Sequence, residues 1–341
     1  MANMQSNITT DVTIIGAGPV GLFAIFELGM LKMHAHVVDA LPSVGGQCTA
    51  LYPEKPIYDI PGFPSIDAQS LIDNLEKQAA PFNPTYHLGQ QVTGCKKLDN
   101  GNWQVTTSTG TVIESKAVII AAGCGAFGPN RPPMQGLESY EGTAVHYMVT
   151  KKDMFAGQTI VIAGGGDSAV DWANSLAPIA KKTYVVHRRD KFRAMPESVD
   201  QMKKLEAEGK IEMVIPYQLE ALEGDGTKLS GIVVSTMEGE KRTLPADHLL
   251  AFFGLSMDLG PIASWGLNLH KNHIATSPTT SETSEAGLFA IGDIATYDHK
   301  LKLILCGFSE AAFAAHSIYK IVNPNVELHF EYSTSKGVKV A

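Results

Sequence analysis

The chain opens with short apolar runs that are separated by a glycine-rich turn. Residues 11–15 form a β-branched apolar run, which is typical of a buried parallel strand. A G-x-G-x-x-G turn follows directly at Gly16, Gly18 and Gly21, and apolar residues then recur at helical spacing. Residues 36–39 form a second short strand that ends in an acid. The order strand, turn, helix, strand predicts a βαβ unit.

Each glycine of this first unit has a defined task in binding a dinucleotide. Gly16 permits the tight turn, Gly18 lets a pyrophosphate approach the backbone, and Gly21 lets the helix pack closely against the strand. The helix behind the turn offers free N–H groups and the positive end of its dipole to phosphates. Asp39 follows about 20 residues further on, where a carboxylate accepts hydrogen bonds from ribose hydroxyls.

The same unit appears a second time in the middle of the chain. Residues 159–163 are an apolar strand, and the G-x-G-x-x-A turn that follows has its small residues at Gly164, Gly166 and Ala169. A helical pattern behind this turn leads to another strand over residues 183–186. Two dinucleotide-binding units are therefore expected in one chain.

The second unit ends in basic residues, whereas the first ends in an acidic one. Its last strand is followed by His187, Arg188, Arg189 and Arg193. Guanidinium groups match the charge and planar geometry of a ribose 2′-phosphate, whereas NAD binding favours a carboxylate at this point. The second nucleotide is therefore predicted to be NADPH. The alternative is an ordinary solvated basic turn.

Composition adds limits to this picture. The 341 residues are 44% hydrophobic and 18% charged, as in a globular protein, and the net charge of −8 suggests neither a nucleic-acid nor a membrane partner. The apolar stretch over residues 12–26 has no Lys or Arg before it and is too short to span a bilayer, so a cytoplasmic protein is expected. Four widely spaced cysteines form no C-x-x-C, and no metal site is expected.

A third segment supplies the missing part of a flavin site. Residues 286–293 are an apolar strand that closes with Gly292 and Asp293, and a helix is expected over residues 309–321. With these features together, the chain resembles the ferredoxin (flavodoxin)–NADP reductases of the thioredoxin-reductase-like type. The matching segments span nearly the whole chain and are residues 16–21, 45–47, 51–55, 58–62, 164–168, 187–190 and 290–293.

The resemblance implies an α/β fold of two Rossmann-like, three-layer ββα domains, with the NADPH domain inserted into the FAD domain. The FAD-binding domain would be split into residues 1–122 and 250–341, with an NADPH-binding domain of residues 123–249 between them. A Gly/Pro-rich connector over residues 123–133 and a second crossing near residues 246–254 would act as hinges. The resemblance also implies a homodimer.

The resemblance assigns the cofactor contacts to particular positions. FAD would be bound by Gly16, Gly18, Pro19, Gly21, Asp39, Gly46, Gln47, Tyr52, Asp59, Val92, Phe127, Asp293 and Thr334. NADPH would be bound by Gly164, Gly166, Asp167, Ser168, Ala169, His187, Arg188, Arg189 and Arg193. No catalytic residue is expected beyond the flavin itself and its stacking tyrosines, Tyr52 and Tyr332.

The resemblance predicts electron transfer between NADPH and ferredoxin or flavodoxin. NADPH would pass a hydride to flavin N5, and reduced FAD would then give up electrons singly, or the sequence would run in reverse. Thioredoxin reductases carry a C-x-x-C before the second glycine turn, but residues 147–150 contain no cysteine, so electrons would leave the flavin directly. An acidic carrier would need a local basic area, for which Lys55, Lys300 and Lys302 are among the candidates.

Two alternatives stay open at this stage. The same scaffold could reduce another acceptor, such as a quinone or a small disulfide. The chain could also be a flavin-loaded redox sensor without turnover, although a sensor needs no NADPH pocket.

The C-terminal tail, residues 325–341, is expected to cover the flavin. Phe330 and Tyr332 flank a charged residue in a stretch that ends in hydroxyl residues, which suits an aromatic plate and a polar contact for a flat ring. The resemblance implies that Tyr332 stacks on the flavin and that Thr334 hydrogen-bonds near the ring. It leaves open whether the tail covers its own flavin or that of the partner subunit.

Overall fold

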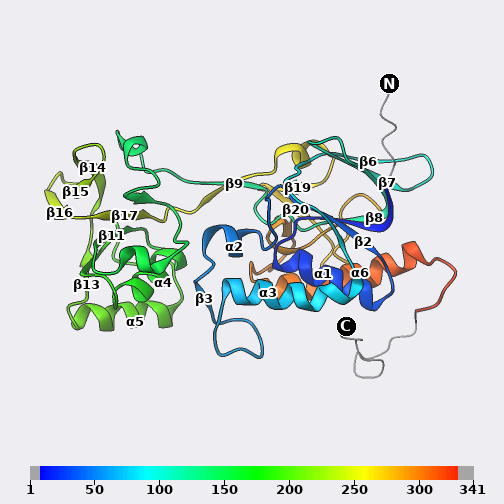
Figure 1. Cartoon of the computed structure of the whole chain (residues 1–341), viewed down its shortest axis with the longest axis horizontal. Helices are drawn as coiled ribbons and strands as arrows, with labels where there is room; N and C mark the ends of the chain where they lie inside the picture. Colours follow the sequence, from blue (N-terminus) through cyan, green and yellow to red (C-terminus); the bar gives the residue numbers. More distant parts are fainter. Residues whose placement is uncertain (1–7, 329–341) are drawn as a thin grey trace. The chain divides into compact units, whose positions relative to one another are not determined.

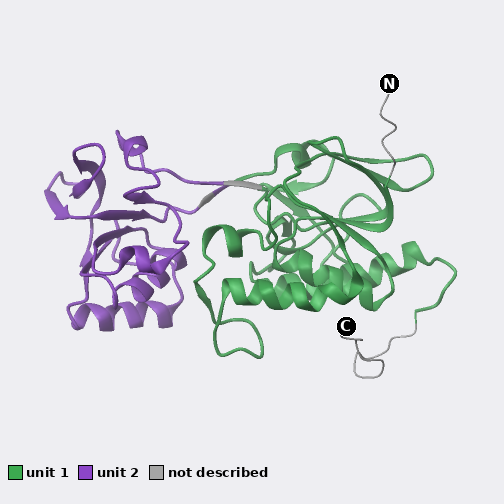
Figure 2. Ribbon diagram, in the orientation of Figure 1, with its two compact units in different colours: residues 1–127, 257–341 green, residues 128–256 purple. Residues whose placement is uncertain are grey.

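The computed structural model describes residues 8–328, except for the side chains at positions 126, 127 and 255. The chain divides into two compact units (Figure 1, Figure 2). Unit 1 comprises residues 1–127 and 257–341, and unit 2 comprises residues 128–256. Within the described residues, no helix is long and apolar enough to cross a membrane.

Unit 1 is built on a mainly parallel sheet with a layer of helices against it. Its strands are β1 (Ile8–Ile15), β2 (Ala35–Val38), β3 (Pro56–Ile57), β4 (Ile66–Asp67), β5 (Thr85–His87), β6 (Val92–Lys97), β7 (Trp103–Thr107), β8 (Val112–Ile120), β19 (Leu269–His270), β20 (His273–Ala275), β21 (Leu288–Ala290) and β22 (Ala295–Thr296). Its helices are α1 (Pro19–Met30), α2 (Gln47–Leu51), α3 (Ala68–Ala79) and α6 (Ile304–Val322), with short 3₁₀ helices η1 (Ala80–Phe82), η4 (Gly260–Ser264) and η5 (Gly292–Ile294).

The sheet of unit 1 has the strand order β5-β2-β1-β8-β7-β6. β8 pairs in parallel with β1 along its length, and it is long enough to pair with antiparallel β7 at its start and with parallel β21 at its end. The last four residues of β1 are all buried, because both faces of the sheet are covered. One apolar core lies between the sheet and helices α1, α3 and α6 (Figure 1), and a second includes Trp103, Leu267 and Ile274.

Unit 2 has a parallel sheet of its own and a small antiparallel sheet. Its strands are β10 (Val145–His146), β11 (Thr159–Ala163), β12 (Lys182–Val186), β13 (Ile211–Val214), β14 (Gln218–Gly224), β15 (Leu229–Ser235), β16 (Lys241–Pro245) and β17 (His248–Ala251). Its helices are α4 (Asp167–Leu176) and α5 (Pro196–Ala207), with short 3₁₀ helices η2 (Leu137–Ser139) and η3 (Lys152–Phe155). The parallel order is β10-β17-β11-β12-β13, and β14-β15-β16 are antiparallel.

The two crossings between the units differ in detail from the expected connectors. β9 (Ala126–Pro129) pairs with β18 (Leu255–Asp258), and the units change inside this two-stranded ribbon. Gly125 permits the pairing, because a Cβ there would lie 2.2 Å from the carbonyl oxygen of Asp258. The expected boundaries at 122/123 and 249/250 fall earlier, and the second would cut β17, which is paired in the sheet of unit 2.

The final helix begins earlier than the sequence pattern predicts. The expected helix covers residues 309–321, whereas α6 begins at Ile304. Gly307 lies inside the helix and faces α1, since a Cβ there would lie 2.4 Å from Val20 Cγ2. This glycine, which lies before the expected helix, is therefore required for close helix packing.

Candidate dinucleotide-binding sites

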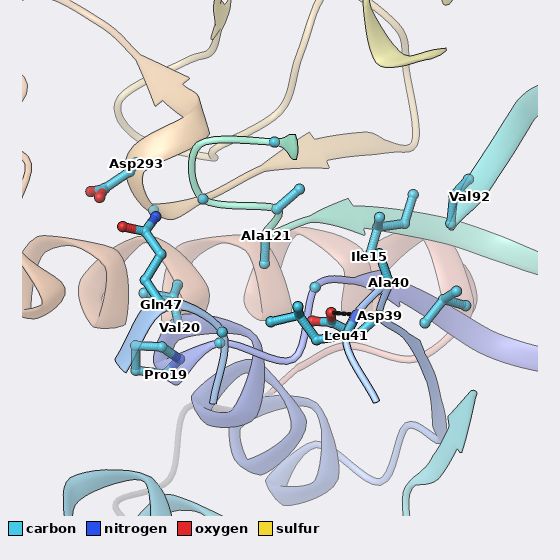
Figure 3. A pocket seen from close by; sticks show the side chains of 18 of the residues that line it. Ile15, Pro19, Val20, Asp39, Ala40, Leu41, Gln47, Val92, Ala121 and Asp293 are labelled. Atoms are coloured by element: carbon cyan, nitrogen blue, oxygen red, sulfur yellow. Dashed lines mark hydrogen bonds between the residues drawn. The ribbon is translucent and has the colours of Figure 1, made fainter. Parts of the chain in front are cut away.

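A cavity of about 400 Å³ opens in unit 1 at the carboxyl ends of the parallel strands (Figure 3). Its walls come from the segments that follow β1, β2 and β8, and from η5. Asp39 and Val92 lie towards one end of it, and Gln47 and Asp293 towards the other (Figure 3). Open α/β sheets bind their ligands in a crevice of this kind.

The glycines of the first turn are required by close backbone approaches. Gly16 has a φ of 110°, and a Cβ there would lie 2.3 Å from the carbonyl oxygen of Ala121. A Cβ at Gly21 would lie 2.0 Å from the carbonyl oxygen of Gly16, so this glycine serves packing behind the cavity. Gly18 differs, because nothing lies within 4 Å of a Cβ placed there. The free space beside Gly18 suits a ligand that lies against the backbone.

Helix α1 presents its N-terminus to this free space. It begins at Pro19 after Gly18, and no side chain caps its N–H groups. Uncapped N–H groups and the helix dipole bind phosphate oxygens well. Gly46, at the start of α2, approaches the same place, since a Cβ there would lie 3.1 Å from Gly18 Cα. These backbone segments form a slot that fits a pyrophosphate.

Asp39 connects the first turn to the end of β2. Its carboxylate accepts hydrogen bonds from the Ala17 N–H at 2.6 Å and the Leu41 N–H at 2.8 Å. Burial raises the pKa of this carboxyl group, and the two backbone hydrogen bonds act in the opposite direction. Each carboxylate oxygen retains a lone pair that can accept a ribose hydroxyl. The residue thus orders the turn in addition to its predicted ribose contact.

The far end of the cavity is polar and aromatic. Gln47, Tyr52 and Asp293 all line it. Tyr52 is held by two neighbours: its hydroxyl lies 3.8 Å from Cys48 Sγ, and Lys55 Nζ lies 5.8 Å from the centre of its ring. Burial raises the pKa of Tyr52, so this hydroxyl stays protonated at neutral pH. An aromatic ring beside two polar side chains suits the flavin half of FAD.

The remaining predicted FAD contacts are less well placed or are not described. Asp59 lies exposed between β3 and β4 and does not line the cavity. Phe127 belongs to β9, but its side chain lies outside the described residues. Tyr332 and Thr334 also lie outside the described residues. Sequence reasoning missed the wall formed by Leu259, Pro261 and Ile262, since no motif marks these residues.

Unit 2 contains a second glycine turn, in which close contacts again require glycine at some positions and leave one glycine facing open space. Gly164 has a φ of 153°, and a Cβ there would lie 2.6 Å from the carbonyl oxygen of Phe252. A Cβ at Gly165 would lie 2.2 Å from His187 Cε1, whereas nothing lies within 4 Å of one at Gly166. Helix α4 begins directly afterwards with Asp167 and Ser168 exposed and Ala169 buried.

The basic segment after β12 folds back beside this turn. The Arg193 N–H donates to the carbonyl oxygen of Gly165 at 2.7 Å, and the ring of His187 stacks on Phe192 at 5.0 Å. Burial lowers the pKa of His187, and the neighbouring arginines lower it further, so the imidazole is neutral at pH 7. The positive charge of the segment therefore lies on its guanidinium groups and on Lys191.

Arg188, Arg189 and Arg193 are all exposed. Among the described residues, none of the three forms an ion pair with an acid. Their N–H donors are thus available to an anionic ligand at the second glycine turn. This arrangement fits a dinucleotide that carries a 2′-phosphate.

Comparison with known proteins places the chain in a family. The pyridine nucleotide-disulphide oxidoreductase family matches residues 10–311. The ferredoxin–NADP reductase of Paramagnetospirillum magneticum is 59% identical over 329 residues, which are 96% of this chain and 98% of that protein. The ferredoxin–NADP reductase of Rhodospirillum rubrum is 56% identical over 339 residues, 98% of each chain.

Solved structures show the same fold. The thioredoxin reductase of Lactococcus lactis, in its FR conformation, matches with a TM-score of 0.79 at 25% identity, and 92% of this chain and 99% of that chain are covered. The thioredoxin reductase of T. acidophilum matches with a TM-score of 0.80 at 24% identity, and 92% and 98% of the chains are covered.

Proposed function

The chain belongs to the pyridine nucleotide-disulphide oxidoreductase family, and from this premise we propose that it is a ferredoxin–NADP reductase with FAD and NADPH as its cofactors. The observation that carries the proposal is 59% identity to a ferredoxin–NADP reductase across 96% of the chain. Both glycine turns needed for two dinucleotides are present, and each leaves one glycine facing open space.

The residues of each unit have separate tasks in this proposal. In unit 1, Gly18 and the N-terminus of α1 would bind the pyrophosphate of FAD, Asp39 the adenosine ribose, and Tyr52 and Asp293 the flavin half. In unit 2, the turn at Gly166 would bind the pyrophosphate of NADPH, and the exposed arginines its 2′-phosphate. Bound FAD supplies the conversion between two-electron hydride transfer and one-electron transfer.

The acceptor is proposed to receive electrons directly from the flavin. Residues 147–150 carry no cysteine, and Tyr147 there donates its hydroxyl to Glu141 at 2.7 Å. The four cysteines are free thiols, and Cys48 lines the cavity. A carrier of single electrons therefore fits better than a disulfide substrate. Ferredoxin is the proposed carrier, and flavodoxin is an alternative of the same class.

Three further parts of the proposal concern the whole protein. We infer that it is a homodimer, that it works in the cytoplasm, where its free thiols suit a reducing compartment, and that its C-terminal tail covers the flavin. A chain truncated before Glu331 tests the role of the tail. The flavin absorbance and the stopped-flow rate of hydride transfer should both change, and two unchanged readings would contradict the proposal.

The central experiment measures acceptor choice. Purified protein should show a flavin absorbance spectrum and should reduce cytochrome c with NADPH much faster after ferredoxin is added. Quinones and small disulfides should be reduced more slowly than ferredoxin under the same conditions. If ferredoxin gave no acceleration, the assignment would be wrong, and absence of NADPH turnover with any acceptor would favour a redox sensor.

A further inference from the structure

A buried carboxylate stands behind the cofactor cavity of unit 1. Glu310, in α6, is only 3% exposed. Its Oε2 accepts the N–H of Gly292 at 2.8 Å, and its Oε1 accepts the hydroxyl of Tyr297 at 2.7 Å. Lys300 forms an ion pair with the same Oε1, and both side chains of this pair are 4% exposed. Each oxygen of the carboxylate thus has a defined partner.

The position of α6 brings this carboxylate to the turn. Gly307 and Glu310 are three residues apart and therefore share one face of the helix. A Cβ at Gly307 would lie 2.4 Å from Val20 Cγ2, so the missing side chain lets the helix approach α1 closely, and the Cα of Gly292 lies at van der Waals distance, 3.4 Å, from the same point. Glu310 then reaches the Gly292 N–H directly. The helix contacts both Val20 of α1 and the η5 turn, which are two walls of the cavity.

The hydrogen bond to Gly292 determines what this turn can offer a ligand. Gly292 has a φ of 75°, a conformation that favours glycine, and its N–H is directed to Glu310 and not to a phosphate. Asp293, the next residue, lines the cavity. The η5 turn therefore presents the Asp293 side chain to the ligand, while its first N–H is used to fix the turn.

Lys300 and Tyr297 in turn hold the carboxylate of Glu310 in place. Lys300 was a candidate for docking an acidic carrier, but its buried ion pair removes it from the surface. Burial raises the pKa of Tyr297, and the hydrogen bond to Glu310 raises it further, so the phenol remains a donor. A buried carboxylate with three donors is held in one orientation.

We propose that Glu310, held by Lys300 and Tyr297, is a positioning residue that sets the Gly292–Asp293 turn for the flavin half of FAD. The inference rests on the proposed function, because it assumes that FAD occupies this cavity. Glu310 does not line the cavity and acts through the turn alone. Its loss should therefore weaken binding at the flavin end and leave the adenine end, at Asp39, unchanged.

The test uses full-length apoprotein and two ligands. FAD binding is measured by fluorescence titration, and ADP, which lacks the ribityl and flavin groups of FAD, is measured by competition. The variants are Glu310→Gln and the double variant Lys300→Met with Glu310→Met. The double variant removes both buried charges together, because a single change leaves Lys300 unpaired in the interior. Glu212→Gln is the control, since Glu212 forms ion pairs with Lys182 and Arg242 in unit 2.

The expected result is a selective loss at one end of the cavity. The Kd for FAD should rise roughly 10- to 150-fold in both variants, the size expected for a lost hydrogen bond to a charged group, while the Kd for ADP stays constant. The absorbance band of the remaining bound flavin should shift, and the control should match wild type. Unchanged FAD affinity in either folded variant, or an equal loss for FAD and ADP, would overturn the inference. Failure of wild-type protein to bind FAD would instead refute the proposed function.

Discussion

The removal of Arg188 and Arg189 tests the nucleotide preference of unit 2 most directly. Both side chains are exposed, and among the residues that the structure describes neither has an acidic partner. Replacing them with glutamine should therefore change the free energy of unfolding by no more than about 0.5 kcal/mol. Any large effect on NADPH use must then come from the ligand contact.

The size of the effect on NADPH binding follows from the hydrogen bonds between the arginines and the 2′-phosphate. A hydrogen bond between a guanidinium group and a phosphate contributes about 1.5 to 3 kcal/mol, which corresponds to roughly 10- to 150-fold in affinity. NADH carries no 2′-phosphate, so its binding affinity should not change. The KM for NADPH should therefore rise at least ~10-fold in each single variant and further in the double variant, though not additively, because both arginines would contact one phosphate.

The assay is steady-state oxidation of NADPH and of NADH with one artificial acceptor. The informative quantity is the ratio of kcat/KM for the two nucleotides, since it cancels effects on FAD content. Arg131→Gln serves as the control, because Arg131 is another exposed arginine of unit 2 and is ion-paired with Glu141 at 2.8 Å. A double variant that keeps the wild-type ratio would refute the assignment of these arginines to the 2′-phosphate.

Three other predictions follow from named contacts. Changing all four cysteines to serine should preserve NADPH-driven electron transfer, and loss of activity with FAD still bound would reveal a thiol relay. Gly165→Ala should weaken NADPH binding while FAD absorbance persists, because the new Cβ would lie 2.2 Å from His187; equal NADPH affinity would contradict this. Burial lowers the pKa of His146 to about 4 and also lowers that of His248, so the unfolded state binds more protons between about pH 6.5 and 4. Thermal stability should fall across that window on acidification, and His146→Phe should flatten the slope.

The elements that the sequence predicts correctly are those whose formation depends on residues close together in the chain. The first βαβ unit and the second are found as β1-α1-β2 and β11-α4-β12, with every strand end within three residues of the expected one. The demand on Gly21 is local, since a Cβ there would meet the carbonyl oxygen of Gly16. Gly16 and Gly164 instead face the distant carbonyl oxygens of Ala121 and Phe252, and they were readable only because the glycine motif marks them. The basic segment was readable because it directly follows its strand.

Features that join distant segments were not predictable from the sequence. Lys300 and Lys302 look alike in the sequence, yet Lys300 is buried against Glu310, whereas Lys302 is exposed and contacts His273. Charge alone does not tell which lysine faces solvent, because that depends on where α6 packs. The double hydrogen bond of Asp39 to the backbone was likewise invisible, because it depends on how two loops meet.

The same scaffold serves different acceptors, and the thiols of Cys48 and Cys124 bear on which acceptor this chain uses. Cys48 lies beside Tyr52 and lines the cavity, but burial raises its pKa to about 11, with the Tyr52 hydrogen bond acting in the opposite direction. A thiol exchanges with a disulfide only as the thiolate, which is scarce at neutral pH for such a group. Burial also raises the pKa of Cys124. Neither thiol is therefore suited to the relay of thioredoxin reductases, which supports the proposal that electrons pass directly to an external carrier.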